Sequence, residues 1–178
     1  MIKKVVQAGD SRLRKLSKPV EKIDRKILLL ISDLKETLLA HKDPEGVGLA
    51  APQIGKNLRV FVMRDGEEIK TVINPEIIST TKAKTAKTKK DNKDEALEGC
   101  LSIPHYYGSL TRGGEITIKY LNEDGQKVVE TFKDFPAQIV QHEIDHLEGH
   151  LFVDRLLKQK RPLYQIKGDE VEEVDFTQ

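Results

Sequence analysis

Apolar residues recur every three or four positions between Lys22 and His41, which is the spacing of one helix face. The repeating residues are Ile27, Leu30, Ile31, Leu34 and Leu38. Asp24 stands where a carboxylate can accept hydrogen bonds from the first free N–H groups, and Pro44 and Gly46 follow the last apolar position. The pattern predicts a helix over residues 22–41 with Asp24 as its cap.

Shorter apolar segments predict strands in the next part of the chain. Residues 58–63 are apolar and rich in β-branched side chains, and the Asp-Gly pair at 65–66 is a turn signal. Residues 71–73 predict a short strand that is stopped by the Asn-Pro pair at 74–75, because proline cannot donate to a strand ladder.

A hairpin is predicted further along. Residues 115–121 alternate between apolar and polar positions, and residues 127–132 return after a turn over 122–125. Between the strands and this hairpin lies a segment, residues 79–96, that is rich in Thr and Lys and has no apolar periodicity. It predicts a solvated surface insertion, and a small basic contact for RNA is the alternative.

A second helix is predicted over residues 136–148. Its apolar face would consist of Ile139, Val140, Ile144 and Leu147. Asp134 is a candidate cap, Pro136 falls in the first turn, where a missing N–H is tolerated, and Gly149 can end the helix. Beyond it the pattern weakens: residues 158–178 read as a variable tail, in which 171–176 predict a terminal strand.

Composition limits the class of protein. The chain has 178 residues, of which 38% are hydrophobic and 33% are charged, and its formal net charge is +1. This size suits one domain, residues 1–178. The balanced charge excludes a wholesale polyanion binder, so no DNA partner is expected. The single cysteine excludes an intramolecular disulfide and favours a cytoplasmic location. No apolar run approaches the roughly 20 residues of a membrane-spanning helix, so no membrane partner is expected.

The strongest chemical signal is the segment His142-Glu143-Ile144-Asp145-His146. Residues four apart on a helix share one face, so the imidazoles of His142 and His146 can converge on one divalent metal ion. Glu143 follows the first histidine directly and can reach a water at such an ion as a general base.

Two histidines leave a catalytic metal short of a third protein ligand. The metzincin pattern needs a histidine where this chain has Phe152, and the acidic residues of 170–173 follow a stretch with little helical pattern. Cys100 is the other candidate. A lone cysteine is more often an inert buried residue, but beside an incomplete two-histidine site it completes a three-ligand set with an open position.

Residues 46–55, Gly-Val-Gly-Leu-Ala-Ala-Pro-Gln-Ile-Gly, form a third candidate segment. Their small side chains allow close approach of another chain, and the spacing lacks both common phosphate-binding patterns. Gln53 offers an amide that can donate to an oxyanion. By the residues alone, a tight turn with a packed pair of alanines is the favoured interpretation.

Together these segments closely resemble the peptide deformylase family. Residues 46–53 (GVGLAAPQ) are similar to its first motif, residues 98–102 (EGCLS) to its second and residues 141–147 (QHEIDHL) to its third, in the family's order. The resemblance extends over roughly residues 1–157. It implies an α+β fold with antiparallel sheets around a central helix that carries the HExxH motif. It also implies hydrolysis of the formyl group from N-formylmethionine on newly made polypeptides, with release of formate.

The resemblance further implies the roles of individual residues. Cys100, His142 and His146 would hold one divalent metal ion, commonly Fe(II) in the family, with Ni(II), Co(II) or Zn(II) as substitutes. Glu143 would be the catalytic acid and base, and Gln53 with the backbone N–H of Leu101 would stabilise the oxyanion. Gly48 and Val47 would bind the substrate. The expected partners are a formyl-methionyl peptide and, transiently, the ribosome.

Two other functions stay open at this point. One is an HExxH metallopeptidase, and the other is a non-catalytic module that binds metal or RNA. The sequence also departs from the family pattern in its long segment at 79–96 and in its C-terminal tail, which lacks a long basic helix. Arg112 stands near a position where the family often has an arginine.

Overall fold

The computed structural model describes residues 1–81 and 97–175 of the chain. Two antiparallel sheets form its β structure. The larger sheet has the order β1-β2-β3-β6-β7, with strands β1 (Gly48–Ala50), β2 (Val60–Asp65), β3 (Glu68–Thr80), β6 (Glu115–Leu121) and β7 (Lys127–Lys133). The smaller sheet has the order β4-β5-β8-β9, with strands β4 (Leu97–Cys100), β5 (Ile103–Ser109), β8 (Leu163–Lys167) and β9 (Glu170–Val174).

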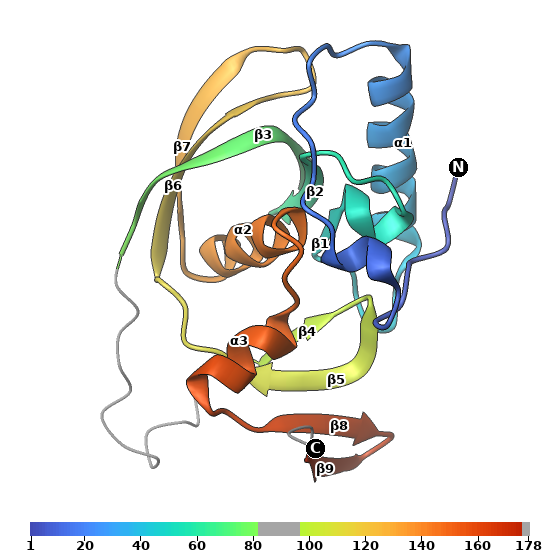
Figure 1. Ribbon diagram of the computed structural model, residues 1–178, viewed down its shortest axis with the longest axis vertical. Coiled ribbons are helices and arrows are strands. Elements are labelled where there is room, and N and C mark those ends of the chain that lie inside the picture. The colour runs from blue at the N-terminus through green and yellow to red at the C-terminus, as the bar shows by residue number, and fades with distance from the viewer. Residues whose placement is uncertain (82–96, 176–178) are drawn as a thin grey trace.

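Three α-helices accompany the sheets in the described part of the chain. They are α1 (Arg25–Ala40), α2 (Asp134–Leu147) and α3 (Phe152–Gln159), and two short 3-10 helices are η1 (Ser11–Arg14) and η2 (Ala51–Ile54). Figure 1 shows the long strands β3, β6 and β7 curving around α2, with α1 on the other side of the larger sheet. This arrangement confirms the predicted α+β class with antiparallel sheets around a central helix.

The core forms on both sides of the larger sheet. On one side the apolar face of α2 packs against the inward residues of β2, β3 and β6, including Phe61 and Ile118. On the other side the predicted face of α1 packs beneath β2 through Leu34 and Leu38, which are fully buried. Helix α1 begins where expected, because the Asp24 side chain accepts hydrogen bonds from the N–H groups of Lys26 and Ile27.

The predicted end of the strand at residues 71–73 was wrong. Strand β3 continues through Asn74 and Pro75 to Thr80, so Ser79 and Thr80 belong to a strand and not to the predicted insertion. The register against β6 shifts between Ile73 and Glu76, and Asn74 has φ 52°. Proline is accommodated at such a bulge, where no ladder hydrogen bond is required from it. Thr81 follows the strand, and the rest of the predicted insertion, residues 82–96, lies outside the described residues.

The predicted cap of the second helix was also wrong. Asp134 is itself the first residue of α2, with φ 54°, and its N–H donates to the carbonyl of Gly114. Lys133 occupies the capping position and makes no side-chain capping bond. Pro136 does lie in the first turn, and Gly149 follows the end of the helix with φ 78°, where a side chain would be strained.

Several elements were not predicted or were assigned differently. Strands β4 and β5 were not predicted. Helix α3 and strand β8 fall in the part of the chain where no pattern was recognised. Residues 48–54 form strand β1 and helix η2, where a tight turn was favoured. The terminal strand predicted at 171–176 is confirmed over residues 171–174 as part of β9, which pairs with β8, and residue 176 lies outside the described residues.

Candidate metal centre

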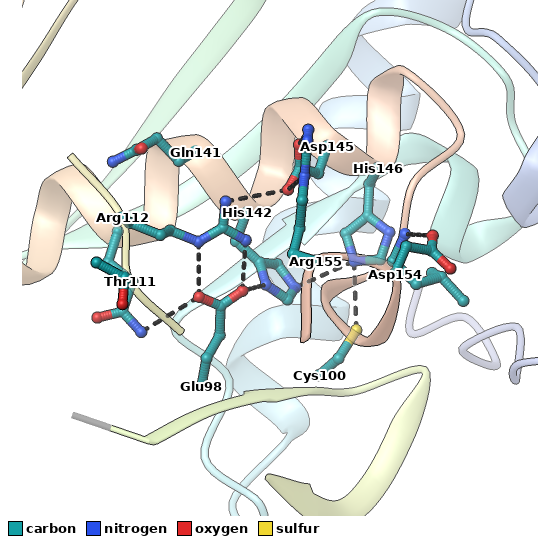
Figure 2. Close-up of polar contacts among 12 residues, drawn as sticks. Glu98, Cys100, Thr111, Arg112, Gln141, His142, Asp145, His146, Asp154 and Arg155 are labelled. Carbon is teal, nitrogen blue, oxygen red and sulfur yellow. Dashed lines mark hydrogen bonds and ion pairs between the residues drawn. The ribbon is translucent and has the colours of Figure 1, made fainter. Parts of the chain in front are cut away.

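Three ligand side chains converge at the junction of α2 and β4. His142 and His146 come from successive turns of α2, and Cys100 ends β4 (Figure 2). Their nearest ligand atoms all lie within 4.8 Å of one another: Nε2 of His146 is 3.1 Å from Nε2 of His142 and 3.2 Å from Sγ of Cys100. Ligands of a tetrahedral ion lie roughly 3.3–3.6 Å apart. These three side chains therefore fit one small divalent ion.

Local structure explains why these side chains meet. The i, i+4 spacing puts both histidines on one face of α2, where both are buried. His142 contacts Glu98 and His146 contacts Cys100, two residues of β4. The register of β4 against β5 shifts between Gly99 and Cys100, so Cys100 lies opposite Ile103. Cys100 therefore leaves the regular ladder at the position where it joins the ligand triad. The sequence prediction of the ligand triad agrees with this geometry.

Glu98 orients the first histidine. Its Oε1 lies 2.7 Å from Nδ1 of His142, and an ionised carboxylate can only accept, so Nδ1 donates and the lone pair of Nε2 faces the other ligands. Burial of Glu98 opposes its ionisation. Hydrogen bonds from Arg112 and His142 outweigh that effect and lower the pKa of Glu98 to about 2. The carboxylate thus stays charged and fixes the imidazole.

Arg112 extends this contact into a buried network. Its Nε and Nη2 donate to the two oxygens of Glu98 at 2.7 and 2.6 Å, and its Nη1 donates to Asp145 at 3.0 Å. Asp145 also accepts two hydrogen bonds from Arg155 on α3. Figure 2 shows this chain of side chains running from α3 across α2 to the histidines.

His146 is suited to act as a neutral ligand. Its complete burial holds the pKa of His146 well below its ordinary value. Its Nδ1 is buried and has no hydrogen-bond partner among the described residues. The lone pair of Nε2 is consequently available at neutral pH.

Glu143 lies beside the triad and points into a pocket. Its Oε2 is buried without a hydrogen-bond partner in the described part of the chain. Burial raises the pKa of Glu143 to about 7. A carboxyl group with such a pKa can take up and return a proton near neutral pH.

The pocket, of about 190 Å³, is open to one side and is lined by the other predicted site residues. Val47, Gly48, Gln53 and Leu101 all line it. The amide of Gln53 is held in place, because its Oε1 accepts from the N–H of Ala50 while its Nε2 donates to Ser102 at 3.2 Å and faces Sγ of Cys100 at 3.5 Å. The structure therefore brings every predicted site residue except His146 to the wall of one pocket. His146 contacts two of the lining residues, Cys100 and His142.

Sequence reasoning missed the supporting charges. Glu98 and Asp145 stood inside the recognised motifs without an assigned role, and Arg112 was noted only for its position. Arg155 was not considered at all. Their contacts join residues that lie 10–44 positions apart, so no local pattern announces them. The one available signal was that an HExxH histidine normally needs an acceptor for its second nitrogen.

The chain is similar to proteins of one family along most of its length. Residues 2–162 match the family model for polypeptide deformylase. A peptide deformylase of Pseudothermotoga lettingae is 47% identical over 161 residues, which are 90% of this chain and 86% of that protein.

Solved structures agree with the sequence comparison. A peptide deformylase from Legionella pneumophila superimposes with a TM-score of 0.77 at 40% identity, covering 90% of each chain. A class I type b peptide deformylase from Acinetobacter baumannii, solved with Met-Ala-Ser bound, gives a TM-score of 0.73 at 31% identity over 87% of this chain and 98% of that one. The sequence, the fold and the three-ligand centre of the present chain together show that it belongs to the polypeptide deformylase family.

Proposed function

We propose residue roles for the reaction of this peptide deformylase, which removes the N-formyl group from nascent peptides. The observation that carries the proposal is the buried carboxyl group of Glu143, whose Oε2 has no hydrogen-bond partner among the described residues. This group lies beside a Cys/His/His centre and lines a pocket. A carboxyl group without a partner is costly to bury, and here its proton transfer serves the reaction.

Cys100, His142 and His146 would hold a single divalent ion, and we propose Fe(II) as the native one. When bound, such an ion lowers the pKa of a coordinated water and polarises a carbonyl oxygen. The donor set fits this role, since three protein ligands leave an open coordination position. Thiolate and imidazole ligands accept several first-row metals, so Ni(II), Co(II) or Zn(II) would also bind.

Glu143 would act first as a base and then as an acid. It takes a proton from the attacking water while the water oxygen adds to the formyl carbon. It then returns this proton to the nitrogen of the methionine as the C–N bond breaks, which releases the free amine of the peptide and formic acid, and the acid ionises to formate. The pKa of about 7 suits both transfers near neutral pH.

Gln53 and the backbone N–H of Leu101 would donate to the oxyanion that develops on the formyl oxygen. Gln53 supports this role because its carbonyl side is already fixed by Ala50, which leaves the NH₂ group turned toward the centre. Loss of one such donor typically costs about 100- to 1000-fold in rate.

Gly48 and Val47 would bind the substrate main chain along β1. The pocket between β1 and β4 has apolar walls that suit a methionine side chain, including Leu97, Phe135 and Ile139. Further support is the relative from Acinetobacter baumannii that was solved with Met-Ala-Ser bound.

Incubation of the metal-loaded protein with formyl-Met-Ala-Ser tests this function. We expect stoichiometric formate and free Met-Ala-Ser. An unformylated longer peptide, added in parallel, should stay intact. Internal cleavage of that peptide would instead support the metallopeptidase alternative, and no reaction with either would support a binding module.

We further propose that the protein works in the cytoplasm, where nascent chains emerge, with transient ribosome association. None of the described helices is long and apolar enough to cross a membrane. The sequence support for the ribosome contact is the set of six lysines between residues 82 and 93. Replacing all six by Gln should weaken cosedimentation with ribosomes and flatten its salt dependence, with little effect on short-peptide kinetics. Unchanged cosedimentation would leave the segment as a solvated insertion.

A further inference from the structure

Arg155 is a charged residue that the proposed reaction does not use. It stands on α3, and its guanidinium spans the carboxylate of Asp145: Nη2 donates to Oδ1 at 2.5 Å and Nε donates to Oδ2 at 3.2 Å. Asp145 lies on α2 directly before His146, and its side chain is only 9% exposed. Arg155 is thus the outermost member of the charge network behind the metal centre (Figure 2).

We propose that Arg155 is a positioning residue for the metal centre. Through its contact with Asp145, and from there through Arg112 and Glu98, it fixes the orientation of His142. The proposal rests on the metal-binding role given to Cys100, His142 and His146 above. It concerns how firmly these ligands are held and not the chemical steps.

The charge balance of the network explains the effect. Two carboxylates, Glu98 and Asp145, face two guanidiniums, Arg112 and Arg155, and all but Arg155 are almost fully buried. Without Arg155, the carboxylate of Asp145 would keep only Arg112 of these two guanidiniums as a hydrogen-bond donor and positive partner. Arg112 would then be drawn toward Asp145 and would hold Glu98 less firmly, since buried charges are strongly coupled. Glu98 is the group that fixes Nδ1 of His142.

The space around Arg155 makes the proposal testable without unfolding the protein. A cavity of about 270 Å³ is bordered by Arg112, Asp145 and Arg155. The Arg155 side chain is 38% exposed. A substitution there admits water to Asp145 and leaves no buried void, so the fold should be retained.

The test measures metal retention of the Co(II)-loaded protein in the absence of substrate. Arg155→Met keeps most of the apolar stem and removes the charge. We expect it to release Co(II) to a chelator about three- to tenfold faster than the unchanged protein, below the roughly 10- to 100-fold effect of a direct partner of a ligand. The visible absorption of bound Co(II) should also change. Arg155→Lys should lie between the two, because it restores the charge but not the two-point contact.

A matched control is Arg14→Met. Arg14 pairs with Asp154, the neighbouring residue of the same helix, at similar exposure. If α3 merely needs anchoring, this variant should accelerate Co(II) release as much as Arg155→Met does, and the proposal would be overturned. We expect it to match the unchanged protein.

The pathway is tested by a double variant. If Arg155 acts through Asp145, then Arg155→Met added to Asp145→Asn should accelerate Co(II) release no further than Asp145→Asn alone. The proposal would be overturned if the double variant released Co(II) faster than Asp145→Asn by the factor that Arg155→Met shows alone. It would also be overturned if Arg155→Met and the unchanged protein had the same release rate and the same absorption. These readouts need no substrate, so a failure of the assigned deformylation chemistry would be seen separately, as lost formate release with normal Co(II) retention.

Discussion

The carboxyl group of Glu143 is prepared for proton transfer by its surroundings. Its burial raises the pKa to about 7, and Gly48 of β1 allows the backbone to approach it closely. A Cβ atom on Gly48 would lie 2.3 Å from Oε1 of Glu143 and 2.9 Å from Cγ2 of Ile139. Glycine is required here by this contact and not by an unusual backbone angle.

Gly48→Ala should therefore lower kcat/KM for formyl-Met-Ala-Ser by at least tenfold, because the added methyl group displaces the carboxyl group of Glu143. Steady-state kinetics and metal analysis of the purified variant would measure this, and metal content should stay normal. Gly114→Ala is the control, since a Cβ there meets no atom within 4 Å. Equal losses in both variants would contradict the assigned contact.

Cys100→Ser should weaken metal retention. A hydroxyl group is a poorer ligand than a thiolate for Fe(II), Ni(II) or Zn(II) at neutral pH. We expect a substoichiometric metal content after dialysis and a proportional loss of deformylation. Metal analysis beside kinetics would measure both. Normal content and activity would mean that the third ligand lies elsewhere.

The sequence supported these side chains unequally. The spacing of His142 and His146 on a predicted helix was sufficient for two ligands and for Glu143. Cys100 could be assigned as the third ligand only because the other ligand patterns were absent and because the motif around it resembles the family. Glu98, Arg112 and Arg155 could not be assigned, because their contacts depend on how β4, the β5–β6 connection and α3 pack together.

Helix α1 shows a local signal that was read correctly. The Asp24 side chain accepts two backbone hydrogen bonds at the start of the helix, as its position predicted. The periodic apolar face of the helix is buried as expected. Both features depend on residues a few positions apart, which is the range that sequence patterns cover.

Asp24→Ala should destabilise the protein by about 0.5–2 kcal/mol, because two N–H groups lose their acceptor. Urea unfolding would measure the change, and kcat should stay unaltered since α1 does not line the pocket in the described structure. Glu21→Ala, at an exposed site nearby, should change stability by less than about 0.5 kcal/mol. A neutral Asp24→Ala would contradict the capping role.

The elements that were misread depend on distant partners. Strand β3 passes through Asn74 and Pro75 because the Asn74 side chain bonds both N–H and C=O of Val20, a residue 54 positions away. Helix α3 has only eight residues and is held by Phe152 and Leu156 in a core with Cys100. Neither partner can be recognised in a short sequence window.

The metal centre lies where the two sheets approach each other. Edge strand β1 of the larger sheet and edge strand β4 of the smaller one line the same pocket, with α2 between them. Cys100 belongs to β4 and both histidines to α2, so a bound ion would link these layers. The assignment of residues 1–178 to one domain stays a prediction, which this linkage supports.

Removal of the metal should therefore lower the melting temperature. An ion present at about 100 times its dissociation constant contributes about 2.7 kcal/mol, which corresponds to roughly 5–10 °C for a chain of this size. Differential scanning calorimetry with and without chelator would measure the shift, and added metal should restore it. Cys100→Ser should show a smaller shift. An unchanged melting temperature after verified metal loss would contradict the linkage.

The most direct test of the account is formate release by Glu143→Gln at the same metal occupancy as the unchanged protein. The amide keeps the shape of the side chain but cannot accept the proton, so we predict intact metal content and a loss of several powers of ten in kcat on formyl-Met-Ala-Ser. Turnover near that of the unchanged protein, with the metal in place, would contradict the role of Glu143 and with it the proposed mechanism.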